Sequence, residues 1–158
     1  MPRSTDRGEP AGILVYGTLR SGMGNDRIWR AKSGRSVPAM LPGARLYDLS
    51  FGFPAVVLGD CGLEPGEPVH GELISCEDML GVLLALDRLE GYDPDRPPER
   101  NHYQRMLVDV EVPSGERLPA WIYVYDAERL RQVEGAELVP HGDWCAWLQA
   151  REESRDVR

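Results

Sequence analysis

The sequence of 158 residues contains little lysine, little cysteine and no long apolar run. Lys32 is the only lysine, so arginine supplies nearly all of the positive charge. Three cysteines, Cys61, Cys76 and Cys145, form no C-x-x-C pair and are odd in number, which argues against a disulfide framework and favours a reducing compartment. No apolar stretch approaches the roughly 20 residues of a membrane-spanning helix, and the N-terminus lacks the apolar core of a signal peptide. We therefore expect a cytoplasmic protein without a membrane partner.

Positive charge is also scarce as a whole. The chain has 18 lysines and arginines against 26 aspartates and glutamates, a formal net charge of -8. An acidic protein repels phosphates and gains nothing from counterion release, so nucleic acid is excluded as the main partner. His70, His102 and His141 lack the H-x-x-x-H and H-E-x-x-H spacings of metal sites. With no G-x-S-x-G motif and no Cys–His pairing, we expect chemistry without a metal, a cofactor or a protein nucleophile.

The length and composition predict a single domain over residues 12–151, preceded by a flexible arm over 1–11 and followed by a frayed tail over 152–158. The strands fall in groups and do not alternate with helices, which favours a mixed or antiparallel sheet in an α+β fold. The predicted elements are a strand over 13–16, a short helix capped by Asn25, two or three strands within 36–60, a turn over 62–68, a strand over 69–74, a helix from about 78 to 90 that starts at Ser75 and Asp78, a hairpin of strands over 103–112 and 117–125, and a helix over about 143–151.

The first strand runs directly into a glycine-containing turn, Tyr16–Arg20. Backbone amides in such a turn can face a small anion, and Gly17 suits it because a close approach or a positive φ excludes larger residues. Tyr16 and Thr18 either line a pocket or pack the interior. Arg20 is either a partner for a substrate carboxylate or a solvated loop residue. The turn is therefore a candidate binding element.

An acidic residue occupies the apolar face of the central helix. Glu90 lies one turn beyond Leu86 and two beyond Leu83, where helical periodicity places a core residue. Burial raises the pKa of a carboxyl, and such a group can exchange protons near neutral pH. The alternative is a solvated residue at the helix end. Asp87 is interpreted as structural, paired with a nearby arginine (Arg88 or Arg105) or solvated.

Taken together, the turn and the helix end resemble the gamma-glutamylcyclotransferase-like superfamily, in the branch of AIG2-like, BtrG-like and gamma-glutamylamine cyclotransferases. The resemblance covers about residues 12–126. The segments that carry it are Tyr16–Arg20, Phe53–Val57, Val69–Leu73, Leu86–Tyr92 and Tyr103–Arg105.

The resemblance implies a small mixed β-barrel flanked by helices. It also implies that the turn of Tyr16, Gly17, Thr18 and Leu19 binds the glutamyl group and that Glu90 is the acid–base residue. The reaction would release 5-oxoproline from a small γ-glutamyl amine or amide, through attack of the substrate's own α-amine on its γ-carbonyl. Tyr125 either reaches the same pocket and contacts the substrate or fills the barrel, and Tyr103 and Arg105 would brace the site.

Two other functions stay open at this point: a γ-glutamyl hydrolase that uses water in the same pocket, and a small-molecule binding module without turnover. The loop over 91–101 is either a lid or wall of the site or a mobile surface loop. Neither the leaving amine nor the oligomeric state follows from the sequence.

Overall fold

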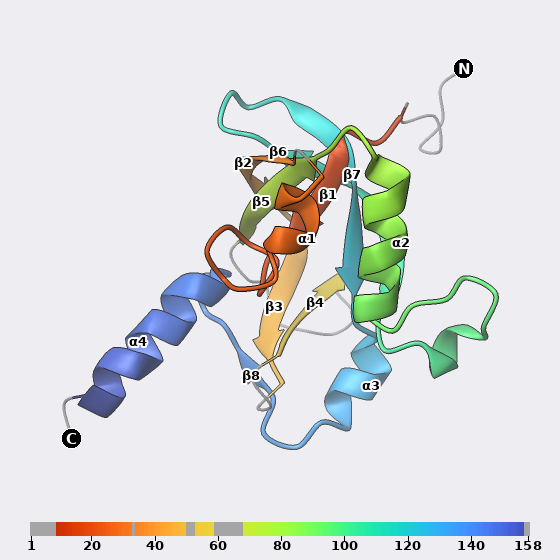
Figure 1. Ribbon diagram of the computed structural model, residues 1–158. Helices are drawn as coiled ribbons and strands as arrows, with labels where there is room; N and C mark the ends of the chain where they lie inside the picture. Colours follow the sequence, from red (N-terminus) through yellow and green to blue (C-terminus); the bar gives the residue numbers. More distant parts are fainter. Residues whose placement is uncertain (1–8, 33, 50–52, 59–67, 157–158) are drawn as a thin grey trace.

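The computed structural model describes residues 9–32, 34–49, 53–58 and 68–156 (Figure 1). Its elements, in chain order, are β1 (Gly12–Val15), α1 (Arg27–Arg30), β2 (Arg35–Leu41), β3 (Ala44–Asp48), β4 (Pro54–Leu58), β5 (Val69–Ser75), α2 (Met79–Leu89), the 3₁₀ turn η1 (Pro98–Arg100), β6 (Gln104–Glu111), β7 (Arg117–Val124), α3 (Ala127–Arg131), β8 (Glu137–Leu138) and α4 (Trp144–Asp156). The predicted 62–68 turn and 1–11 arm lie mostly outside the described residues.

Five of the strands close into a barrel in the order β1-β5-β2-β6-β7. β1 pairs antiparallel with β5 and parallel with β7, so the barrel is mixed, as expected. Every residue of β1 is buried, which explains why its sequence is apolar without alternation. The predicted hairpin is confirmed as β6 and β7, paired from Gln104↔Val124 to Glu111↔Arg117.

A second, three-stranded sheet in the order β4-β3-β8 lies beside the barrel. Its apolar side chains pack with α3 in a separate small core around Leu49, Val57 and Leu130. The amide of Tyr125, just after β7, donates to the carbonyl of Val56 in β4 at 2.7 Å. This bond joins the end of the barrel hairpin to the second sheet, and Pro54 of β4 lies close to Gly17, just after β1.

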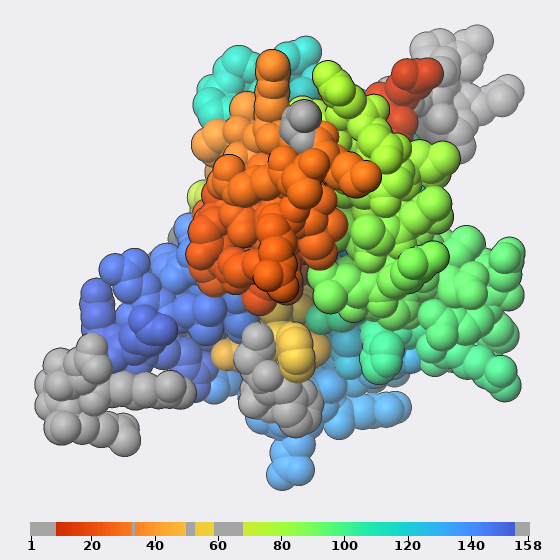
Figure 2. All heavy atoms as spheres, viewed as in Figure 1, coloured from red at the N-terminus to blue at the C-terminus, as the bar shows by residue number. Residues whose placement is uncertain are grey.

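Helix α2 packs beside the barrel and contacts α1, and the two helices share one face of the molecule (Figures 1 and 2). Its inward residues Val82, Leu83 and Leu86 are buried, and each contributes roughly 1.5–3 kcal/mol through that burial. Glu90 is the C-cap residue. Gly91, at φ 66°, ends the helix in the left-handed conformation that glycine adopts without strain. The helix therefore ends where the sequence predicts.

Three details of the prediction were wrong. Asp78 itself caps α2 by accepting from the Gly81 amide, while Ser75 is the last residue of β5. Asn25 does not cap α1, whose N-cap residue is Asp26, because its side chain is bonded to Thr18. The last helix, α4, continues to Asp156, five residues beyond the predicted end and into the segment expected to be frayed.

Candidate active site

A cavity of about 630 Å³ lies at the junction of the barrel, the second sheet and the C-terminal end of α2. All six site residues singled out from the sequence line it: Tyr16, Gly17, Thr18, Leu19, Glu90 and Tyr125. They come from three separate parts of the chain, namely the turn after β1, the end of α2 and the end of β7. The fold thus brings the predicted turn and the predicted acid to one pocket.

The turn after β1 has space for glycine alone at position 17. A Cβ atom at Gly17 would lie 2.6 Å from Cγ of Pro54 in β4, closer than real Cβ contacts allow. Close approach of the second sheet, rather than a positive φ, therefore requires glycine here. Among the described residues, no acceptor bonds the amides of Gly17, Thr18 or Leu19. These residues line the cavity, so their three amides are available as donors to a ligand bound there.

Hydrogen bonds from the following segment fix the shape of this turn. The Arg20 amide donates to the carbonyl of Gly17 at 3.0 Å. The Asn25 side chain donates to Oγ1 of Thr18 at 2.9 Å, and Nε1 of the buried Trp29 donates to the carbonyl of Leu19 at 2.8 Å. These three contacts from the chain that follows hold successive residues of the turn in place, so its amides are presented by a braced loop.

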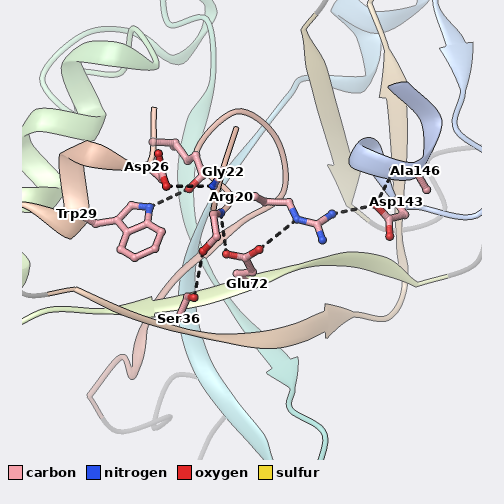
Figure 3. A network of polar contacts seen from close by, with 10 residues as sticks. Arg20, Gly22, Asp26, Trp29, Ser36, Glu72, Asp143 and Ala146 are labelled. Atoms are coloured by element: carbon pink, nitrogen blue, oxygen red, sulfur yellow. Dashed lines mark hydrogen bonds and ion pairs between the residues drawn. The ribbon is translucent and has the colours of Figure 1, made fainter. Parts of the chain in front are cut away.

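Arg20 is not among the residues that line the cavity, and the interpretation of a solvated loop residue was wrong, because its side chain is largely buried in ion pairs. Its Nη1 lies 2.9 Å from Oδ1 of Asp143, and its Nε lies 3.6 Å from Oε2 of Glu72 (Figure 3). Oε1 of Glu72 also accepts from the Ser21 amide at 2.9 Å. Arg20 thus links the turn after β1 to β5 and to the start of α4.

Asp143 has two structural roles in this network. It accepts from the Ala146 amide at the first turn of α4 and pairs with Arg20 (Figure 3). Burial alone would raise the pKa of Asp143, but the Ala146 hydrogen bond and the Arg20 guanidinium outweigh it and hold that pKa below its usual value. The carboxylate therefore stays ionised and keeps the contact between the turn and α4.

Glu90 is the acidic group of the cavity wall. Burial raises the pKa of its carboxyl from 4.5 to about 7. Three tyrosines surround it. Burial is the main cause that raises the pKa of Tyr16, Tyr103 and Tyr123, and the negative charge of Glu90 raises each further. Near neutral pH the phenols stay protonated, whereas Glu90 can take up or release a proton.

The phenol protons of these tyrosines are already engaged in hydrogen bonds. Tyr16 donates to the Tyr123 carbonyl at 2.6 Å, and Tyr103 donates to the Pro54 carbonyl at 2.8 Å. Tyr123 donates to Oδ1 of Asp87 at 2.7 Å. The tyrosines therefore connect the barrel, the second sheet and α2 around Glu90.

Asp87 is structural, and its predicted partner Arg105 is confirmed. Nε of Arg105 lies 2.9 Å from Oδ1 of Asp87, and its Nη2 lies 3.3 Å from Oδ2. The guanidinium also stacks over the rings of Trp121 and Tyr92, at 4.6 and 5.4 Å from their centroids. This partly buried, two-point pair fixes the last turn of α2, three residues before Glu90.

A family model for AIG2-like gamma-glutamyl cyclotransferases matches residues 13–146. The chain belongs to this family. The match begins in β1 and ends in the first turn of α4, so it includes every cavity residue named above.

Solved structures share the fold. The chain is similar to YkqA from Bacillus subtilis, with a TM-score of 0.63 and 21% identity over 92% of this chain and 43% of that one. An AIG2-like protein from Mus musculus has a TM-score of 0.58 and 23% identity, over 86% of this chain and 88% of that one. The uropathogenic E. coli-specific protein c4763 has a TM-score of 0.58 and 16% identity, over 87% and 94%. This chain thus spans less than half of the Bacillus protein. No curated protein sequence matches it.

Several cavity residues were not recognised as such from the sequence. They include Asn25, Leu49, Phe53, His102, Tyr123 and Val133. Tyr123 is opposite Arg105 in the β6–β7 register, so only the pairing reveals that it reaches the site. Of the loop over 91–101, Gly91 alone lines the cavity.

Among the described residues, no three metal-binding side chains gather into a group, and no helix has the length and apolar character to cross a bilayer.

Proposed function

We propose that this protein is a γ-glutamyl cyclotransferase that releases 5-oxoproline from a small γ-glutamyl amine or amide. The observation that carries the proposal is the placement of Glu90, with a pKa of about 7, in the same cavity as the amide turn of residues 16–19. Family membership supports the reaction class. The turn would bind the glutamyl group, and Glu90 would carry the proton.

In the proposed reaction the substrate's α-amine nitrogen forms a bond to its γ-carbonyl carbon. Ionised Glu90 takes the proton that this nitrogen loses and gives it to the leaving nitrogen, while the bond between the γ-carbon and that nitrogen breaks. No net proton, water or electron is consumed. Ring closure is intramolecular, so a cavity that holds the glutamyl chain folded can supply an effective molarity on the order of 10⁵ M.

The turn amides are the donors best suited to negative charge on the substrate. The hydroxyls of Tyr16, Tyr103 and Tyr123 donate within the protein, whereas the amides of Gly17, Thr18 and Leu19 have no acceptor among the described residues. The amides would therefore bind the substrate carboxylate or stabilise the oxyanion of the tetrahedral intermediate. Tyr125 would contact the substrate from the end of β7, where its amide is bonded to the second sheet.

The test is 5-oxoproline formation from a panel of γ-glutamyl amides by the Glu90→Gln variant. Loss of the acid–base group is expected to reduce kcat by about 10²–10⁴-fold. Glu77→Gln is the matched control, because Glu77 is exposed before α2 and does not line the cavity. Retained turnover in a folded Glu90→Gln variant contradicts the assignment. Free glutamate as product would indicate a hydrolase, and ligand-induced heat protection without turnover would indicate a binding module.

A further inference from the structure

We infer that the amine released by this protein carries a bulky apolar or aromatic substituent without a further charged group, and that this substituent binds against the second sheet. The inference rests on the proposed function and concerns the part of the cavity that the glutamyl group would leave unfilled. Two independent features support it: the volume of the cavity and the chemistry of one of its walls.

The cavity is too large for a γ-glutamyl group alone. A γ-glutamyl group has about nine non-hydrogen atoms, and at roughly 30 Å³ for each, the share of one liquid water molecule, it would fill roughly 270 Å³. The cavity measures about 630 Å³. More than half of it therefore remains for the amine partner, a volume that suits a bulky group rather than ammonia or a short alkylamine.

The wall formed by the ends of β3 and β4 in the second sheet, the end of β7 and the segment after α3 is apolar. Its lining residues are Leu49, Phe53, Pro54, Tyr125 and Val133. The ring of Tyr125 packs edge-to-face on Tyr103 with centroids 5.5 Å apart, which gives the wall a fixed aromatic surface.

The charged or imidazole side chains among the described lining residues all belong to a different wall. They are Arg88 and Glu90 at the end of α2 and His102 after the following loop. The nearby Arg129 guanidinium lies 5.7 Å from the Tyr125 ring centroid, but it is outside the lining and already donates to backbone carbonyls of the 99–102 segment. An ammonium or carboxylate group held against the apolar wall would therefore lose hydration without an oppositely charged lining side chain to pair with, at a substantial cost. An uncharged apolar group would instead gain from leaving water.

Phe53 is the most exposed side chain of this wall, so a bound ligand would cover more of its surface than of any other residue there. Its side chain is 58% exposed, although it lies in the cavity lining. Its carbonyl accepts from the Leu49 amide at 3.0 Å, so the backbone that carries the ring is tied to the end of β3. A substrate group that covers this ring removes apolar surface from water, and we assign Phe53 as a specificity-determining residue.

The experiment compares kcat/KM for 5-oxoproline release from four synthetic conjugates: γ-glutamyl-phenethylamide, γ-glutamyl-ethylamide, γ-glutamyl-phenylalanine and the monoamide of cadaverine. Phenethylamine and phenylalanine differ by one carboxylate, and cadaverine adds a distal ammonium. We expect the phenethylamide to exceed each of the others by about tenfold or more, in line with what apolar pocket contacts discriminate. Equal values, or a preference for the cadaverine or phenylalanine conjugate, would overturn the inference.

Variants then locate the effect. Phe53→Ser and Val133→Ser are each expected to lower the ratio of phenethylamide to ethylamide kcat/KM by about threefold to tenfold. Val37→Ser is the control, because Val37 is an exposed apolar residue of β2 outside the cavity, and its ratio should stay at the wild-type value. An unchanged ratio in both folded cavity variants would contradict the assigned wall.

The outcomes separate this inference from the proposed function. Turnover of all conjugates without preference would leave cyclisation standing and overturn the apolar amine. If no conjugate releases 5-oxoproline, the proposed function fails, and calorimetric binding of the same conjugates tests the wall. Tighter binding of the phenethylamide than of the ethylamide would then support an apolar subsite, and equal binding would refute it.

Discussion

Removal of the Glu90 charge should stabilise the folded protein, and the gain should depend on pH. The carboxyl has an ordinary pKa of 4.5, which burial raises to about 7 in the folded chain. Between these two values the folded state binds more protons than the unfolded state, so stability falls as the pH rises. Below pH 4.5 both states are protonated and Glu90 imposes no such cost. Above pH 7 the whole cost is present.

The size of this cost follows from the two pKa values. Their difference, at 1.36 kcal/mol per pH unit, corresponds to about 3 kcal/mol. Glu90 faces a cavity rather than a sealed core, and solvent there reduces the cost, so we expect about 2–3 kcal/mol. Glutamine has a similar shape and does not titrate. Glu90→Gln should therefore gain this amount relative to wild type between pH 4.5 and pH 8.

Urea unfolding of wild type, Glu90→Gln and Glu77→Gln at pH 4.5, 5.5, 6.5 and 8 would measure the effect. The difference between Glu90→Gln and wild type should grow with pH, mostly between 5 and 7, and reach about 2–3 kcal/mol, or roughly 4–12 °C in Tm. The exposed Glu77 should show no comparable trend. A difference that is constant across the series would mean that Glu90 is solvated, and it would remove the physical basis for its acid–base role.

Three further predictions use other parts of the site. In a pH–rate profile, kcat/KM should rise with pH through about 7, because Glu90 must be ionised to accept a proton, and a flat profile from pH 5 to 8 would contradict this. Gly17→Ala places a Cβ 2.6 Å from Pro54 Cγ, so urea unfolding should show a loss of about 1–3 kcal/mol, together with a raised KM; wild-type values would show that the turn can yield. Arg20→Met leaves Asp143 without its guanidinium partner and should cost about 1–3 kcal/mol by the same assay, whereas an unchanged stability would show that the ion pair is not needed to hold the turn.

Local pattern predicted the parts of the site that depend on neighbouring residues. The apolar run of β1, the glycine turn after it and the helical stripe that carries Glu90 can each be recognised in a short stretch of sequence. The closed barrel itself was expected from the family resemblance. Periodicity could not supply it, because the parallel pairing of β1 with β7 joins segments about a hundred residues apart.

The contacts that pattern could not predict are those between distant segments. Arg20 looked like a loop residue because Glu72 and Asp143 are far from it in the sequence. Tyr123 reaches the cavity through the register of the hairpin, and its partner Asp87 lies on another element. Short elements such as α3 and β8 have too few residues to show a period, yet α3 supplies part of the packing behind the apolar wall.

The energetics of α2 explain how the fold can keep an acid in this position. An ionised Glu90 costs the folded chain about 2–3 kcal/mol, since desolvation accounts for its raised pKa. On the same helix, buried Leu83 and Leu86 each contribute roughly 1.5–3 kcal/mol, which offsets that cost. The Asp87–Arg105 pair holds the last turn in place. The desolvation that weakens the fold above pH 7 also brings the pKa of Glu90 near neutrality, so a variant that solvates this carboxyl should gain stability and lose turnover together.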